Sequence, residues 1–227
     1  MRGLRKKIAE RMQHSKNTAA HFAYVDEFDC TELVNLRKRL KPLAERYGVN
    51  VTYIPIIMKA LVPCLREYPL LNSSLDEASS ELVLKHYYNI GFAVDTDRGL
   101  TVPVVRDVEN KSILEIASEM AELAERARSG RSKLEDLQGG TFTITSTGNI
   151  GGLFATPIIN FPEVAILGVP KMRRRPWVVN EQIVIRDVLC LAISLDHRVV
   201  DGAVGARFMN RLIEYLADPS RLVLEMA

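Results

Sequence analysis

One of the four histidines of the chain, His197, stands where a strongly apolar, strand-like segment meets a helix-like segment. Asp201 lies four residues further on, and Gly202 follows it. An imidazole exchanges its proton near neutral pH and a nearby acid supports it, so this pair is a candidate general base with its carboxylate. Both residue types also ligate metals, but no third ligand cluster stands nearby in the sequence, which disfavours a metal site. On residue type alone, a lone histidine is more often structural.

A run of hydroxyl side chains is the second candidate. Alternate residues of a strand share one face, so Thr143, Thr145 and Thr147 are predicted to lie on the same side. The segment Gly148-Asn149-Ile150-Gly151-Gly152 follows them and matches neither GxGxxG nor the P-loop. Because Pro157 argues against a helix there, a tight turn that approaches a ligand is the better interpretation. The ordinary preference of threonine for strands is the competing explanation.

The N-terminal part of the chain is predicted to alternate helices and strands. The apolar spacing predicts an amphipathic helix over 3–18 and a strand over 21–28. Asp29 is expected to cap the next helix, with Glu32 completing a capping box, and that helix ends near Gly48. These elements would lead the chain into the central sheet.

The remaining elements predict a mixed sheet. In order, they are a helix after Pro55, two strands within 82–94, an extended segment over 101–105, a helix over 112–128, strands over 141–145, 164–169, 178–185 and 188–195, and a closing helix over 201–216. The last two strands, joined at Arg186-Asp187, form either one long bent strand or a hairpin. The order predicts a single α/β domain over residues 1–227, and its irregular alternation disfavours a Rossmann fold or a barrel.

The composition excludes several classes of protein. With 47% hydrophobic and 26% charged residues among 227, the chain resembles a soluble globular protein. A net charge of +2 and the lack of a long apolar run predict neither nucleic acid nor a membrane as partner. Cys30, Cys64 and Cys190 are far apart, so no zinc or redox motif is predicted. They suit a reduced cell interior, which predicts the cytoplasm, or the mitochondrial matrix in a eukaryote.

Several longer blocks stand in order along the chain. They are Arg5-Lys6-x-Ile8-Ala9-x-x-Met12, Asn89-Ile90-Gly91-x-Ala93-Val94-Asp95-Thr96, Gly140-Thr141-Phe142-Thr143-Ile144, Pro162-Glu163-Val164-Ala165-Ile166-Leu167-Gly168 and Asp196-His197-Arg198-Val199-x-Asp201-Gly202. Together they resemble the catalytic core of the dihydrolipoamide acyltransferases of 2-oxo acid dehydrogenase complexes. The resemblance runs from Gly3 to about Met226.

The resemblance implies an α/β fold like chloramphenicol acetyltransferase, with two layers, a mixed β-sheet and flanking helices. It implies homotrimers with active sites between subunits, which assemble further into a hollow core. The tail Leu222-Val223-Leu224-x-Met226 resembles the segment that docks neighbouring trimers. The lipoyl and peripheral subunit-binding domains are absent from this chain. Through those missing domains the family contacts a 2-oxo acid decarboxylase and dihydrolipoamide dehydrogenase.

The resemblance also assigns roles to single residues. His197 matches the base that activates a thiol, Asp201 the acid that supports the site, and Thr145 the hydroxyl that stabilises an oxyanion, where many members have serine. Four residues align with contacts to coenzyme A in branched-chain members: Arg37, Thr52, Asp95 and Ser146. Coenzyme A is then a substrate, the lipoyl group is carried on a separate domain, and no metal takes part.

The implied activity is transfer of an acyl group between the dihydrolipoamide of a lipoyl domain and coenzyme A. The segment from Asp29 to Leu43, with Arg37 and Lys41-Pro42, looks most like the branched-chain type. Alternatives are the acetyl or succinyl type of the same family, an acetyltransferase for a small alcohol, and a non-catalytic core scaffold.

Overall fold

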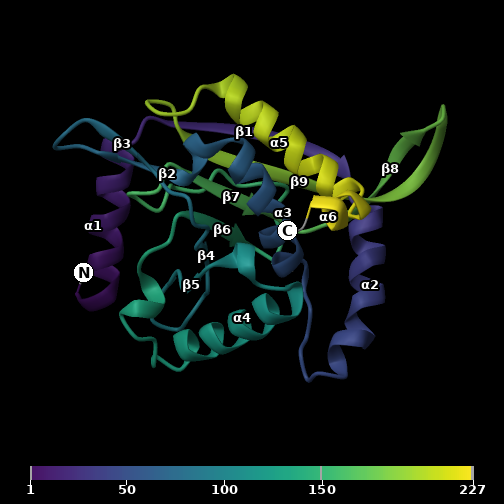
Figure 1. Ribbon diagram of the computed structural model, residues 1–227, viewed down its shortest axis with the longest axis horizontal. Coiled ribbons are helices and arrows are strands. Elements are labelled where there is room, and N and C mark those ends of the chain that lie inside the picture. The colour runs from purple at the N-terminus through teal and green to yellow at the C-terminus, as the bar shows by residue number, and fades with distance from the viewer. Residues whose placement is uncertain (1, 149, 226–227) are drawn as a thin grey trace.

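A seven-stranded mixed sheet forms the centre of the computed structural model, which describes residues 2–148 and 150–225 (Figure 1). The strands are β1 (His21–Asp29), β4 (Ile90–Phe92), β5 (Val104–Val105), β6 (Phe142–Ser146), β7 (Ala165–Val169), β8 (Arg173–Val179) and β9 (Gln182–Asp196), with β2 (Ser73–Asp76) and β3 (Glu81–Leu84) forming a separate hairpin. The main order is β1-β9-β7-β6-β4-β5, and β8 also pairs with β9. Strands β4, β6 and β7 are parallel, whereas the other pairings are antiparallel.

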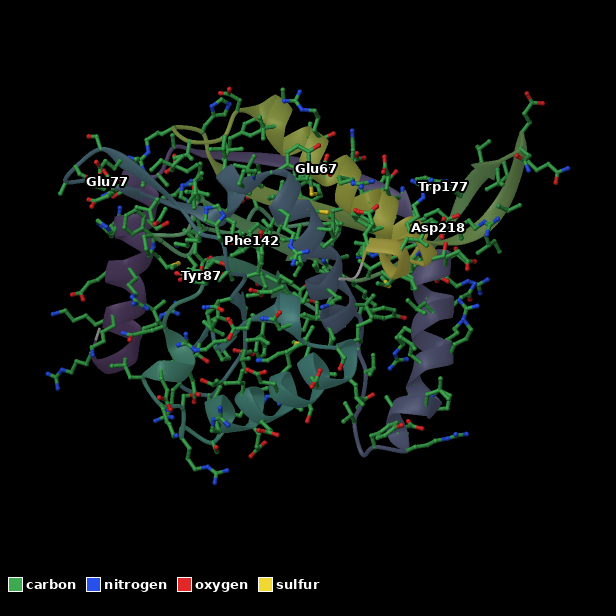
Figure 2. The ribbon with its side chains drawn as sticks, viewed as in Figure 1. Glu67, Glu77, Tyr87, Phe142, Trp177 and Asp218 are labelled. Carbon is green, nitrogen blue, oxygen red and sulfur yellow. The ribbon has the colours of Figure 1, made fainter. Side chains whose placement is uncertain are left out.

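The helices are α1 (Gly3–Thr18), α2 (Thr31–Glu45), α3 (Tyr53–Glu67), α4 (Ile113–Arg128), α5 (Gly202–Ala217) and α6 (Ser220–Glu225), with short 3-10 turns at Pro69–Asn72, Val108–Asn110 and Glu135–Leu137. Helix α3 packs against α4 and α5, and α5 packs against β1 and β9. The main core fills this layer. Phe142 of β6, which Figure 2 labels, contacts the ring of Phe208 of α5 there. The mixed α/β sheet with flanking helices that the sequence predicts is therefore present.

Helix α1 and the segment 150–160 pack together away from the main core. The Ser15 hydroxyl donates a hydrogen bond of 2.6 Å to the carbonyl of Ile159. A small separate cluster of Ala19, Ile159 and Ile166 is buried beside it. His21 joins the two parts as well: its Nε2 accepts from the Ile159 N–H and its Nδ1 lies 3.0 Å from the Ala19 carbonyl. These contacts give His21 a structural role.

The predicted N-cap of α2 is wrong by one residue, because Cys30 and not Asp29 occupies that position. Strand β1 continues through Asp29, which pairs with Val188, so Asp29 stays in the sheet. Its carboxylate accepts hydrogen bonds from the backbone N–H and the hydroxyl of Thr31. Glu32 does not reach back to complete a capping box, because its carboxylate accepts from Asn35.

Of the two alternatives for the segments joined at Arg186-Asp187, the single long strand is confirmed at that joint, because both residues lie inside β9. The chain reverses at Asn180-Glu181, where both residues have positive φ, and the hairpin of β8 and β9 projects from the body (Figure 1). A two-residue turn of this kind matches the twist of its strands, and asparagine tolerates the left-handed conformation. The alternation of apolar residues alone did not reveal this turn.

The predicted closing helix is α5, but a further short helix, α6, follows Pro219. In the predicted docking tail, Leu222 is buried whereas Val223 and Leu224 are exposed, and Met226 lies outside the described residues. Within residues 2–148 and 150–225, no helix combines the length and apolar content needed to cross a bilayer.

Gly205 sets how closely α5 approaches the sheet. A Cβ added there would lie 2.3 Å from Cδ1 of the fully buried Leu195 on β9. We expect Gly205→Val to lower the free energy of unfolding by about 1–3 kcal/mol through overpacking. Urea titration of both proteins measures this, with Ala203→Val on the exposed side of α5 as control. Equal effects of the two substitutions would contradict the packing argument.

Candidate active site

Strand β6 separates two cavities. Thr143, Thr145 and Thr147 line a cavity of about 360 Å³, as the predicted alternation requires. Ile144 and Ser146 point to the opposite face and line a second cavity of about 670 Å³. Adjacent residues of one strand therefore serve different spaces. The prediction that the three threonines share one side is confirmed.

The larger cavity lies against α3 and α4. Three of the four residues predicted to contact coenzyme A, namely Thr52, Asp95 and Ser146, line it together. Arg37 is not among its lining residues; its guanidinium donates to the carbonyl of Val51 at 3.1 Å and stacks over the ring of Tyr53. The structure thus brings three of the four together and places the fourth beside the chain segment that leads into Thr52.

The smaller cavity has mainly apolar walls. Its lining includes Met12, Leu100, Val102, Phe154, Ile158 and Ile166. Ala93 lines both cavities, so the two spaces approach each other at the end of β4. The predicted glycine-rich turn borders the smaller cavity: Gly151 and Gly152 have positive φ, and the Thr147 hydroxyl donates to the Gly151 carbonyl at 3.0 Å. Asn149 of this turn lies outside the described residues.

His197 lies on an exposed turn immediately after β9. Its backbone N–H donates to the Ala20 carbonyl at 2.8 Å, and its ring meets the edge of Phe22 with centroids 5.2 Å apart. Neither cavity includes His197 among its lining residues. The imidazole is therefore presented at the surface by a firmly held turn.

The residues on either side of His197, the buried Asp196 and the exposed Arg198, form an ion pair that sequence reasoning did not single out. The carboxylate of Asp196 accepts hydrogen bonds from the guanidinium of Arg198 at 2.7 to 3.1 Å and from the backbone N–H of Ala20. Burial opposes the charged form, but these bonds outweigh it and hold the pKa of Asp196 below its ordinary value. Arg198 also reaches Glu77 at the turn between β2 and β3 (Figure 2). In the sequence, the only indication of this ion pair was an aspartate and an arginine two residues apart.

Asp201 is the N-cap residue of α5 in backbone conformation. Its side chain is exposed and, among the residues that the structure describes, makes no hydrogen bond or ion pair. The N-terminus of a helix favours a negative charge, so the carboxylate is well placed there. Asp201 follows His197 by four residues along a turn, and among the described residues the two side chains form no hydrogen bond.

Thr145 and His197 are far apart within one chain. Thr145 pairs with Gly168 of β7, which pairs with Ala192 of β9, and His197 follows Ala192 by five residues. Five residues at about 3.3 Å each and two strand spacings of about 4.8 Å separate the two Cα atoms by about 19 Å. A hydroxyl and an imidazole at that distance do not act on the same reacting atom in one chain.

A buried polar cluster closes one end of the smaller cavity, and sequence reasoning missed its role. Glu163 is 4% exposed, and its Oε1 accepts from Nδ2 of Asn160 at 3.0 Å. Its Oε2 is buried and has no hydrogen-bond partner among the residues that the structure describes. Burial raises the pKa of Glu163 to about 7, although bonds from Thr143 and Asn160 and the charge of Lys85 lower it. Burial likewise lowers the pKa of Lys85. The sequence feature that could have indicated this cluster is the acidic residue Glu163 next to a run of apolar residues.

Within residues 2–148 and 150–225, no three His, Cys, Asp or Glu side chains gather in an arrangement that could hold a metal ion.

The sequence model of a protein family, the 2-oxoacid dehydrogenases acyltransferase (catalytic domain), matches residues 1–224. This chain belongs to that family. A structure of chloramphenicol acetyltransferase, 15% identical, covers 95% of this chain and 96% of its own with a TM-score of 0.56, which bears out the predicted fold.

Individual relatives are similar over almost the whole chain. The acetyltransferase component of the pyruvate dehydrogenase complex from Staphylococcus epidermidis RP62A is 46% identical over 98% of this chain and 51% of its own length. The Azotobacter vinelandii dihydrolipoamide acetyltransferase is 44% identical, with a TM-score of 0.94 over 97% of this chain and 90% of that one. A structure of the cubic core of the pyruvate dehydrogenase multienzyme complex has the same values.

These relatives correct one expectation. They are acetyltransferases of pyruvate dehydrogenase complexes, so the branched-chain type suggested by the segment from Asp29 to Leu43 is not supported. The chain spans about half the length of the curated relatives it matches, at 51% to 52%.

The raised pKa of Glu163 predicts a pH-dependent stability. Burial lifts the pKa from 4.5 to about 7. The folded state therefore holds this proton more tightly than the unfolded state. Its contribution is complete below pH 4.5 and is lost as the pH rises through about 7, a loss of about 3 kcal/mol.

Glu163→Gln should remove this part of the pH dependence. Urea unfolding between about pH 4.5 and 8 should show the variant gaining stability relative to the unsubstituted protein as the pH rises. Glu81→Gln on the exposed strand β3 serves as control. Parallel pH profiles for all three proteins would refute the assignment.

Proposed function

We propose that this chain is the catalytic and core-forming domain of a dihydrolipoamide acetyltransferase, which moves an acetyl group between dihydrolipoamide and coenzyme A. The observation that carries the proposal is the pair of cavities on opposite sides of β6, approached by Thr145 and Ser146 and both lined by Ala93. Two substrates that enter from opposite sides meet at such a strand. The names of the relatives favour acetyl as the acyl group.

Residue spacing supports the catalytic assignment. The Azotobacter enzyme was investigated for the roles of a serine, a histidine and an asparagine in its catalytic mechanism. In that enzyme 52 positions separate the serine from the histidine, and four separate the histidine from the asparagine. Thr145, His197 and Asp201 have the same spacing here, with threonine in place of serine and aspartate in place of asparagine.

The separation of Thr145 from His197 requires a second copy of the chain. An exposed imidazole on one subunit completes the site when Thr145 of the neighbouring chain faces it. A closed ring of identical subunits repeats this contact at every interface. The proposed assembly is a trimer that builds a larger core, consistent with the cubic core among the similar structures.

The larger cavity suits coenzyme A. Thr52 and Ser146 offer hydroxyl groups, and Asp95 offers an acceptor for hydroxyl or amide donors. The smaller, apolar cavity then remains for the hydrocarbon chain of the lipoyl group, which a separate lipoyl domain would deliver. The decarboxylase and dihydrolipoamide dehydrogenase would attach through domains outside this chain.

The chemistry begins with a thiol of coenzyme A. His197 takes the thiol proton while the sulfur attacks the thioester carbon of acetyl-dihydrolipoamide, because a thiolate is the effective nucleophile. Complete transfer from a free thiol of pKa about 8.5 to a free imidazole of about 6.5 costs about 2.7 kcal/mol. Transfer concerted with attack avoids much of that cost, and general base assistance contributes about 10²–10⁴-fold.

Attack on the thioester forms a tetrahedral oxyanion. The Thr145 hydroxyl donates a hydrogen bond to it, which contributes about 3 kcal/mol to transition-state stability. Collapse expels the dihydrolipoamide sulfur, which recovers the proton from His197. Both substrates occupy one site at once, so no covalent enzyme intermediate is needed and the three cysteines have no part.

Intersubunit complementation tests the shared site. We expect His197→Ala to abolish transfer and Thr145→Val to lower kcat about 10²–10³-fold with little change in KM. When the two variants assemble randomly together, about one quarter of the interfaces combine the intact histidine with the intact threonine, so activity returns. Mixing His197→Ala with a double variant at both positions is the control. If mixed assemblies are no more active than the separate variants, each chain holds its own site.

Relative rates with three acyl donors test the acyl group. Acetyl-coenzyme A should give the highest kcat/KM, and the value for succinyl-coenzyme A should be lower by at least about tenfold, because an apolar cavity desolvates its free carboxylate without a partner. Isobutyryl-coenzyme A adds two methyl groups near Thr145 and should be intermediate. A preference for isobutyryl would favour the branched-chain type instead.

A further inference from the structure

The side-chain amide of Asn160 is fixed at the wall of the smaller cavity. Both of its N–H bonds have acceptors: Nδ2 lies 3.0 Å from Oε1 of Glu163 and 3.3 Å from Oγ1 of Thr143. Thr143 and Asn160 both line the cavity, whereas Glu163 is buried behind them. Because the carboxyl and the hydroxyl hold the nitrogen, the amide has one orientation rather than two.

The surrounding backbone leaves room for this cluster. A Cβ at Gly140 would lie 2.9 Å from Oε1 of Glu163, and a Cβ at Gly91 would lie 3.0 Å from the Thr143 hydroxyl. Glycine at both positions lets the carboxyl and the hydroxyl occupy the wall of the cavity. Lys85 is the charged group whose field acts on the carboxyl.

The orientation leaves an acceptor free. Among the residues that the structure describes, the Oδ1 oxygen of Asn160 accepts no hydrogen bond. Asn160 is only half-buried and lines both this cavity and a neighbouring one bordered by His14 and Phe161, so its oxygen is open to a ligand at the wall between them. In a mostly apolar cavity, an acceptor of this kind selects a ligand that carries an N–H group.

The position of that acceptor fits the length of the lipoyl arm. Thr143 and Thr145 are two residues apart on β6, about 7 Å, and Asn160 is one hydrogen bond beyond Thr143. Asn160 is therefore about 10 Å from the hydroxyl proposed to stabilise the oxyanion. Dihydrolipoamide carries its reacting thiol and its amide at opposite ends of an extended eight-carbon chain, which spans a similar length.

We propose that Asn160 binds the amide N–H of dihydrolipoamide and that Glu163 and Thr143 position it for this contact. The inference rests on the proposed function and names the recognition site for its second substrate. Apolar walls would hold the hydrocarbon chain, and the Asn160 oxygen would distinguish an amide-linked lipoyl group from other dithiols. Glu163 acts through Asn160 and is a positioning residue.

Binding measurements with two dithiols test the proposal. Dihydrolipoamide and the methyl ester of dihydrolipoic acid share the thiols, the chain and the carbonyl, and only the amide has an N–H. Isothermal titration of the assembled protein should show the amide bound about three- to tenfold more tightly than the ester. Asn160→Leu should abolish this preference and raise KM for dihydrolipoamide.

Glu163→Met separates positioning from direct contact. It removes the acceptor that holds the Asn160 nitrogen while leaving Asn160 in place, so the preference for the amide should fall and KM for dihydrolipoamide should rise. Glu163→Gln retains an acceptor and should restore the preference. Asn35→Leu is the matched control, since Glu32 and Asn35 form a comparable pair on the surface of α2.

The outcomes are distinct. Equal binding of amide and ester by the unsubstituted protein, a preference that survives Asn160→Leu, or binding of neither dithiol would overturn the proposal. Failure of the proposed function would appear separately, as no acetyl transfer from acetyl-coenzyme A to either dithiol. Thermal unfolding of each variant establishes that a lost preference does not come from unfolding.

Discussion

Strand β6 imposes the two-residue period of an extended chain on the whole candidate site. Neighbouring side chains point to opposite faces, so Thr145 and Ser146 enter different cavities although they adjoin in sequence. On each flanking strand, a glycine lies opposite one of the β6 threonines. Thr143 pairs with Gly91 on β4, and Thr145 pairs with Gly168 on β7. A Cβ at Gly91 would lie 3.0 Å from the Thr143 hydroxyl, so glycine at that position leaves room for the hydroxyl.

The pKa values of two buried carboxyl groups, Asp196 and Glu163, shift in opposite directions because the two groups receive different numbers of hydrogen bonds. Asp196 receives several hydrogen bonds from Arg198 and the backbone, so its charge is compensated and its pKa falls. Glu163 receives fewer hydrogen bonds, one of its oxygens has no partner within residues 2–148 and 150–225, and its pKa rises to about 7. The first arrangement holds the turn that carries His197, and the second orients Asn160 at the cavity.

The distance between Thr145 and His197 follows from strand order and not from any single contact. Strand β7 lies between β6 and β9, and His197 comes only after β9 has run well past the pairing with Gly168. The geometry of the sheet therefore keeps the hydroxyl and the imidazole apart within a chain. Association of identical chains is then a requirement of the proposed chemistry and not an addition to it.

Much of this protein could be predicted from its sequence. The periodic patterns predicted α1, β1, α4 and α5 with bounds close to those observed, because local apolar spacing reflects which face of an element is buried. The alternation of Thr143, Thr145 and Thr147 predicted their common face, and the ordered blocks identified the family. His197 and Asp201 were found from residue type and spacing, and their proposed catalytic roles remain predictions.

Other features depended on contacts between distant segments. The turn at Asn180-Glu181 and the start of α2 were set by strand pairing, which local patterns do not contain. Glu163, Asn160 and Thr143 meet only because β6 and the segment before β7 fold together. Sequence thus determined the elements and the candidate chemical groups, because both are local properties. Tertiary structure decided which groups share a cavity, because that depends on the order and register of the strands.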